Sequence, residues 1–96
     1  MSLLEQIKNK KTDLLKIANN YGLKNLRVFG SVARQEEDEK SDVDFLVDVE
    51  SHCTLLELGG AVMDFESVLG RPVDVVTLKG LKKRIRDKVL HEAIPL

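Results

Sequence analysis

Cysteine and long apolar runs are scarce in this 96-residue sequence, and each scarcity excludes a class of protein. A single cysteine, Cys53, cannot form an intrachain disulfide and is too few for a structural zinc site, so packing must hold the fold together. No segment approaches the roughly 18 consecutive apolar residues that suggest a membrane span. Segment 1–12 contains Glu5 and several lysines where a secretory signal needs an apolar stretch, so we expect a cytoplasmic protein with no membrane partner.

Length and composition predict one domain spanning residues 1–96. Hydrophobic residues make up 43% and charged residues 32%, as in soluble globular proteins, and no linker-like stretch divides the chain. The net charge of −1 gives no general attraction to nucleic acid. Charge is nevertheless uneven, because residues 36–50 carry a net charge of −7 and residues 79–88 one of +5. The basic segment is either a solvated helix face or a docking surface.

Apolar periodicity in the first half of the chain predicts a helix and two strands. The helix begins after Ser2, its N-cap, and ends at Gly22, with apolar residues at mostly helical spacing between them. A short apolar strand at residues 26–29 ends at Gly30-Ser31, which begins a turn or a short helix. Residues 42–49 alternate between apolar and mostly polar side chains, which predicts a strand with one buried face.

The second half of the chain predicts two more helices and a third strand. Thr54 and Glu57 have the spacing of a capping box, at the start of a helix that Gly70 ends. A β-branched run at residues 73–77 predicts the strand, and a basic helix follows with a narrow apolar stripe of Leu81, Ile85 and Val89. The predicted fold class is α/β (α+β): a small mixed sheet of three or slightly more strands, flanked by helices, in the order α-β-α-β-α-β-α.

The connections between the strands predict that three aspartates meet at one end of the sheet. The strand–helix–strand unit from residue 42 to residue 77 has the length of a right-handed crossover, so its two strands should be parallel. The loop after Ser31 is short enough for the first two strands to pair antiparallel. This topology places Gly30-Ser31 beside the N-terminal ends of the other two strands, which carry Asp42, Asp44 and Asp74.

Three neighbouring aspartates indicate a cation, and the glycine–serine pair indicates a phosphate. Asp42 and Asp44 are two residues apart on one strand, so their carboxylates point the same way, and Asp74 can complete the set. Such carboxylates repel one another without a cation, and Mg²⁺ prefers carboxylate and phosphate oxygens. Gly30 lets a phosphate approach the backbone, and Ser31 offers a hydroxyl. The alternative is that the two strand aspartates form an ordinary solvated face.

These residues form one motif with a defined spacing. The segment Phe29-Gly30-Ser31-Val32-Ala33-Arg34 contains the glycine–serine pair, and ten residues, Val32 to Ser41, separate that pair from Asp42-Val43-Asp44. The motif resembles the nucleotidyltransferase fold of the DNA polymerase β superfamily, and most of all its stand-alone minimal nucleotidyltransferases. Asp74 falls where the third acid of the family is expected, and the resemblance extends over about residues 26–77. Gln35 departs from the pattern, because family members commonly have glycine there.

The resemblance implies a reaction and a role for each residue. Asp42 and Asp44 would hold two Mg²⁺ ions, while Asp74 would bind the second ion or accept the proton of an attacking hydroxyl. Gly30-Ser31 would bind the β- and γ-phosphates of ATP, the substrate. Arg34 would either contact a phosphate or neutralise the acidic loop that follows it. The hydroxyl would attack the α-phosphorus, and pyrophosphate would leave.

The resemblance also implies a partner. Minimal nucleotidyltransferases are typically paired with a HEPN toxin, an RNase, and act as antitoxins that adenylylate a toxin tyrosine. The expected function is Mg²⁺-dependent transfer of AMP from ATP to a hydroxyl of such a toxin, within a hetero-oligomer. Two alternatives stay open: an antitoxin that neutralises its partner by contact alone, and nucleotidyl transfer to a small molecule. Nucleic acid is not an expected partner, because a chain this small has no room for a template clamp.

Overall fold

Two short helices replace the single N-terminal helix that the sequence predicts. The structure, a computed structural model, describes residues 2–96, and its first elements are α1 (Leu3–Asn9) and α2 (Lys11–Asn20). The prediction of one helix reaching Gly22 is wrong. The apolar stripe lapses between Ile7 and Leu14, where every side chain is polar, so a continuous helix would have no buried face there.

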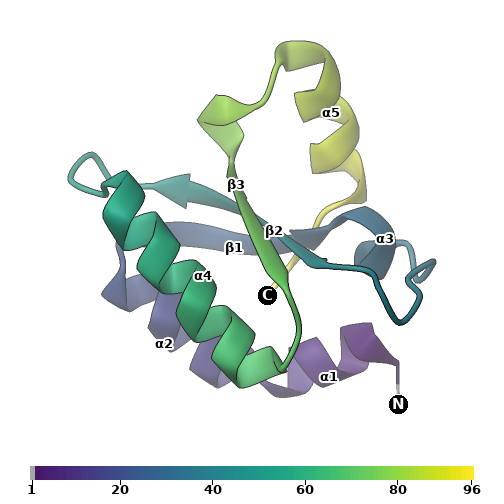
Figure 1. Cartoon of the computed structure of the whole chain (residues 1–96). Helices are drawn as coiled ribbons and strands as arrows, with labels where there is room; N and C mark the ends of the chain where they lie inside the picture. Colours follow the sequence, from purple (N-terminus) through teal and green to yellow (C-terminus); the bar gives the residue numbers. More distant parts are fainter. Residues whose placement is uncertain (1) are drawn as a thin grey trace.

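A four-stranded mixed sheet forms the centre of the molecule (Figure 1). Its spatial order is β3-β2-β1-β4, and its strands are β1 (Leu23–Phe29), β2 (Val43–Val49), β3 (Val73–Thr77) and β4 (Ile94–Pro95). β1 and β2 are antiparallel and β2 and β3 are parallel, as the connections predict. β4 pairs antiparallel with the outer edge of β1. The sequence does not predict β4, because two residues show no alternation.

Helices cover both sides of this sheet. The short α3 (Gly30–Ala33) follows β1, α4 (Leu55–Leu69) connects β2 to β3, and a single 3₁₀ turn (Leu78–Gly80) leads to α5 (Lys83–Glu92). In Figure 1, α1, α2 and α4 lie on one side of the sheet and α5 lies on the other. Within residues 2–96, no helix combines the length and the apolar character needed to cross a membrane. The α/β fold class is confirmed, with β4 and the divided first helix as additions.

The main core lies between the sheet and the helices α1, α2 and α4. β2 contributes Val43, Phe45 and Val47, which are fully buried as the alternation predicts. The ring of Phe45 packs against that of Phe65 in α4, with ring centroids 4.9 Å apart. Leu46, on the other face of β2, is also fully buried. The expectation of only one buried face is therefore wrong at this position. The helix α5 lies on this side of the sheet (Figure 1).

The two ends of α4 follow their sequence signals. The Thr54 hydroxyl accepts a hydrogen bond from the Glu57 N–H at 3.2 Å, and Gly70 ends the helix with a φ of +67°. Lys10, at the break between α1 and α2, donates from Nζ to the carbonyl oxygen of Val68 at 2.8 Å. That carbonyl is one of the acceptors that the end of a helix leaves without an internal partner. The divided N-terminal helix is thus fastened to the last turn of α4.

Candidate functional site

The sheet register brings the predicted site residues together. Asp44 pairs with Phe29 of β1 on one side and with Asp74 of β3 on the other. Because Gly30-Ser31 directly follows Phe29, the turn that begins α3 lies next to Asp44. Asp42 immediately precedes β2, although the sequence predicts it to be the first residue of the strand. The expected meeting of the glycine–serine turn with the ends of two strands is confirmed.

The absence of a side chain at Gly30 leaves room for the carboxylate of Asp44. Gly30 is buried and has a φ of +74°, and a Cβ atom at this position would collide with the Asp44 carboxylate. Only glycine combines this backbone conformation with the missing side chain that the carboxylate needs. The sequence motif predicts that a phosphate approaches the open backbone at Gly30. In the structure, the Asp44 carboxylate takes up that space.

Asp44 is in an unfavourable electrostatic environment. Its partial burial raises the pKa of its carboxyl group, because desolvation penalises the charged form. The negative charges of Asp74 and Asp42 raise this pKa further, whereas the charge of Arg34 opposes the change. The repulsion expected among the three aspartates therefore adds to the effect of desolvation at Asp44. A bound cation would relieve it.

The carboxylates fit a magnesium ion that shares its coordination with a substrate. Asp44 and Asp74 occupy paired positions on adjacent strands, and Asp42 lies just before the first of them. Across residues 2–96, no three His, Cys, Asp or Glu side chains are arranged to hold a metal by themselves. Mg²⁺ usually takes one or two carboxylates and completes its shell with waters and substrate phosphates. The donor set suits Mg²⁺ bound together with a triphosphate.

Arg34 and Gly30 are both held by Glu92, which the sequence does not single out. Glu92 is the last residue of α5, and its side chain is 16% exposed. Its carboxylate accepts a hydrogen bond from the Gly30 N–H at 2.6 Å. Its two oxygens lie 3.2 and 3.0 Å from Arg34 Nη1. No motif marks this residue, a single acid at the end of a basic helix, so only the fold reveals it.

The other side of Arg34 faces the acidic loop. Its Nε donates to Glu36 at 3.1 Å, and this hydrogen bond is the main cause that raises the pKa of the guanidinium, with the charge of Glu92 contributing less. Of the two roles considered for Arg34, neutralisation of the loop is therefore visible in the structure. A phosphate contact would use the remaining N–H groups of the guanidinium, which has five donors.

Gln35 adopts the backbone conformation that glycine favours. Its φ of +56° lies in the left-handed region, which costs a residue with a side chain about 1–2 kcal/mol. Two backbone hydrogen bonds hold the turn, from the Gln35 N–H to Val32 at 3.1 Å and from the Glu36 N–H to Ser31 at 2.8 Å. The turn therefore keeps the backbone conformation that glycine would adopt, although residue 35 is glutamine.

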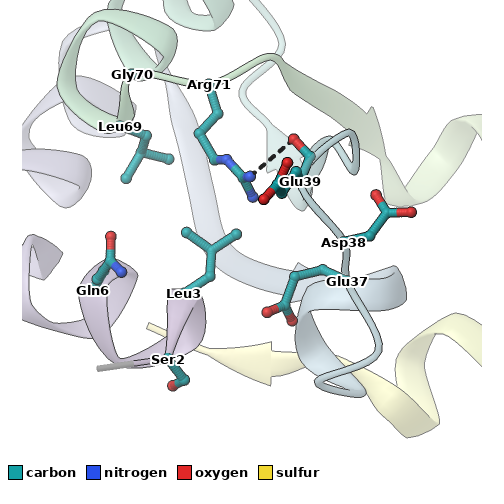
Figure 2. Close-up of a pocket in the computed structure, with 9 residues that line it drawn as sticks. All are labelled: Ser2, Leu3, Gln6, Glu37, Asp38, Glu39, Leu69, Gly70 and Arg71. Atoms are coloured by element: carbon teal, nitrogen blue, oxygen red, sulfur yellow. Dashed lines mark hydrogen bonds between the residues drawn. The ribbon is translucent and has the colours of Figure 1, made fainter.

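A pocket of about 560 Å³ lies beside the acidic loop, and none of the three aspartates lines it. Figure 2 shows that it is bounded by the start of α1, the loop and the turn between α4 and β3. Glu37 points into it, and Arg71 reaches across to donate to the carbonyl oxygen of Glu39 at 3.2 Å. Arg71 thus connects the acidic loop to the rest of the chain, while Glu36, Asp38 and Glu39 in the loop are exposed to solvent.

Comparisons with known proteins agree with this geometry. The Nucleotidyltransferase domain family matches residues 4–96. The protein adenylyltransferase MntA of Thermococcus cleftensis is 38% identical over 95 residues, which cover 98% of this chain and 96% of that protein. A solved structure described as a "putative minimal nucleotidyltransferase" is 43% identical with a TM-score of 0.89, over 100% of this chain and 97% of the other. A crystal structure of a toxin–antitoxin with AMP-PNP is 19% identical, with a TM-score of 0.74. The match covers 88% of this chain and 69% of the other, and the two share the fold.

The α/β fold, with strand carboxylates beside a glycine–serine turn, is that of a nucleotidyl-transferring enzyme. The chain belongs to the nucleotidyltransferase domain family, in its minimal form. The resemblance carried by the motif from Phe29 to Asp44 is confirmed, and the family match extends it to nearly the whole chain.

Proposed function

We propose that this nucleotidyltransferase transfers AMP from ATP to a tyrosine hydroxyl of a partner HEPN-type toxin, and that it acts in this way as an antitoxin. The observation that carries the proposal is the register of Asp44 with Asp74 beside Gly30-Ser31. Two relatives support the kind of substrate: MntA of Thermococcus cleftensis is named a protein adenylyltransferase, and the toxin–antitoxin with the same fold was crystallised with AMP-PNP.

The residues divide into a carboxylate group and a phosphate-binding group. Asp42 and Asp44 would hold two Mg²⁺ ions. Asp74 would be a further oxygen ligand or would accept the proton. Bound Mg²⁺ lowers the pKa of an attacking hydroxyl and neutralises charge on the phosphates. Ser31 would donate its hydroxyl to the β- and γ-phosphates. Arg34 would add a charged contact from the N–H groups not engaged by its two carboxylate partners.

The proposed transfer is one displacement at phosphorus. The tyrosine oxygen forms a bond to the α-phosphorus, and the bond from that phosphorus to the bridging oxygen of the β-phosphate breaks. Pyrophosphate leaves with the electron pair, and the hydroxyl proton passes to a carboxylate, for which Asp74 is our candidate. The product is a tyrosine–AMP phosphodiester. Most of the rate enhancement would come from positioning and from charge stabilisation, because the protein forms no covalent intermediate in this scheme.

The acceptor is proposed to come from a second protein, because this chain's own tyrosine is engaged elsewhere. The Tyr21 hydroxyl donates to Asp64 of α4 at 2.7 Å, on the side of the sheet opposite α5 (Figure 1). The α5 side also offers a partner an exposed apolar residue, because Ile85 is 50% exposed, and this helix carries most of the basic segment. Because α5 packs against α3, a protein docked on it would lie next to the glycine–serine turn (Figure 1).

The decisive experiment combines the purified chain with Mg²⁺, labelled ATP and a co-purified HEPN-type partner. We expect label on the partner and mass spectrometry to locate AMP on a tyrosine. D42N should abolish the label. D13N is the matched control, because Asp13 is an exposed acid on α2, on the other side of the sheet from α5, and lies outside the proposed site.

The other possible results of this labelling experiment each contradict one part of the proposal. Label that appears only on RNA, on a small molecule or on this chain would contradict the antitoxin proposal, while nucleotidyl transfer would stand. Neutralisation of the toxin by D42N as complete as by the wild-type chain would show that binding alone is sufficient. Absence of any label from every nucleoside triphosphate would contradict the proposed catalytic mechanism.

A further inference from the structure

Glu92 contacts two of the three groups that the sequence assigns to phosphate binding. Its carboxylate accepts the Gly30 N–H at 2.6 Å and pairs with Arg34 Nη1 at 3.0 Å, and these contacts join residues about sixty positions apart in the chain. The side chain is 16% exposed, so the carboxylate is largely removed from water. Charge-assisted hydrogen bonds of this kind are stronger than neutral ones.

These contacts fix how the donors are divided between Glu92 and a nucleotide. A backbone N–H has one proton to donate, and the Gly30 N–H is already directed at the Glu92 carboxylate. A phosphate therefore has to use Ser31 and the other N–H groups of Arg34 while Glu92 stays in place. On this geometry, Glu92 does not compete for those groups but orients the segment that carries them.

Glu92 also sets the position of the turn relative to the aspartates. Gly30 lies between two carboxylates, with Asp44 packed where a Cβ would be and Glu92 on its N–H. Arg34 offsets the charge of both, because it pairs with Glu92 and acts favourably on Asp44. Only Val89 among the residues of α5 is buried, so few apolar contacts hold this helix. The Glu92 contacts are thus a principal link between α5 and α3.

We infer that Glu92 is a positioning residue, which holds Ser31 and Arg34 in the arrangement that nucleotide binding and transfer require. The inference rests on the proposed function for the reaction itself. The effect of Glu92 on ATP binding, however, can be measured without any acceptor. A carboxylate that merely occupied the nucleotide's place would have the opposite effect on affinity.

The test replaces Glu92 with glutamine, which keeps the shape and one acceptor oxygen but removes the charge. We expect E92Q to weaken ATP binding in the presence of Mg²⁺, and to lower kcat/KM for AMP transfer, on the order of tenfold each, as the loss of a charge-assisted hydrogen bond allows. D13N, which removes an exposed acid from α2, on the other side of the sheet from α5, should leave both unchanged. Calorimetric titration well below the melting temperature, with circular dichroism as a check, keeps the comparison among folded proteins.

A double-mutant cycle distinguishes positioning through Arg34 from a general loss of stability. If Glu92 acts through Arg34, the double variant E92Q/R34Q should bind ATP no more weakly than R34Q alone. E92D, which keeps the charge on a shorter side chain, should fall between the wild-type chain and E92Q and serves if E92Q does not fold. Tighter ATP binding in E92Q, or fully additive losses in the double variant, would overturn the inference. Absence of transfer by the wild-type chain together with normal ATP binding would instead contradict the proposed function.

Discussion

Replacement of Gly30 by alanine should destabilise the fold more than its position in a turn suggests. Two effects add at this position: a φ of +74°, which costs alanine about 1–2 kcal/mol, and a collision of the new Cβ with the Asp44 carboxylate. Overpacking typically costs about 1–3 kcal/mol, and the lower end applies here because the colliding oxygen ends a side chain that can rotate. We therefore expect a total loss of about 2–3 kcal/mol, a large part of the stability of a small domain.

Two other glycines of the chain separate these effects. Gly70 has a similar φ of +67°, and no atom lies within 4 Å of the place where an alanine Cβ would be, so G70A measures the backbone cost alone. Gly59 lies inside α4 with open space around it, so G59A should raise stability by about 1 kcal/mol through helix propensity. Any extra loss in G30A compared with G70A then reports the collision with Asp44.

Thermal unfolding with a chelator present measures all three variants. A change of 1 kcal/mol shifts the melting temperature by about 4–8 °C for a chain of this size. G30A should therefore melt about 4–8 °C below G70A, and G59A should melt above the wild-type chain. In a D44A background, G30A should cost no more than G70A does. Equal melting temperatures for G30A and G70A would refute the packing of Asp44 against Gly30.

Two further predictions concern charge and capping. Because the folded-state pKa of Asp44 is raised, its ionised form is disfavoured in the folded chain; stability is lost as the pH rises from the unfolded pKa through the folded one. D44N should therefore be more stable than the wild-type chain at pH 7 in chelator, with the advantage fading in acid, and urea unfolding that shows no gain at pH 7 would contradict this. Thr54 caps α4, so T54A should lose about 1 kcal/mol while T54S keeps most of the stability; an unchanged urea midpoint in T54A would show that the cap contributes little.

The sequence predicts the β2–α4–β3 unit well because its signals are local and strong. The apolar positions 43, 45 and 47, the cap at Thr54 and the stop at Gly70 each have a single physical interpretation, and the structure confirms them. The parallel pairing of β2 with β3 follows from the length of the crossover connection, which leaves the chain little choice of topology.

Features that depend on long-range contacts could not be predicted from the sequence. Lys10, at the break between α1 and α2, donates a hydrogen bond to the carbonyl oxygen of Val68, 58 residues away. Nothing in the sequence near Lys10 indicates that partner. Glu92 reaches Gly30 only because α5 folds back over the sheet, and Gly30 contacts a carboxylate that is fourteen positions further along the chain. Pairwise contacts of this kind have no periodicity, so sequence patterns indicate the elements but not the contacts between them.

Residues 94–96 cover part of the outer edge of β1, where a strand of another copy of the chain could otherwise pair. Ile94 pairs with Val28, and the Leu96 N–H donates to the Leu26 carbonyl at 3.0 Å, so part of the outer edge of β1 is covered. An uncovered edge offers unpaired N–H and C=O groups to which a strand of another chain can add. Pro95 has no N–H with which to extend the sheet. Loss of this short segment would therefore open β1 to strand addition and favour aggregation.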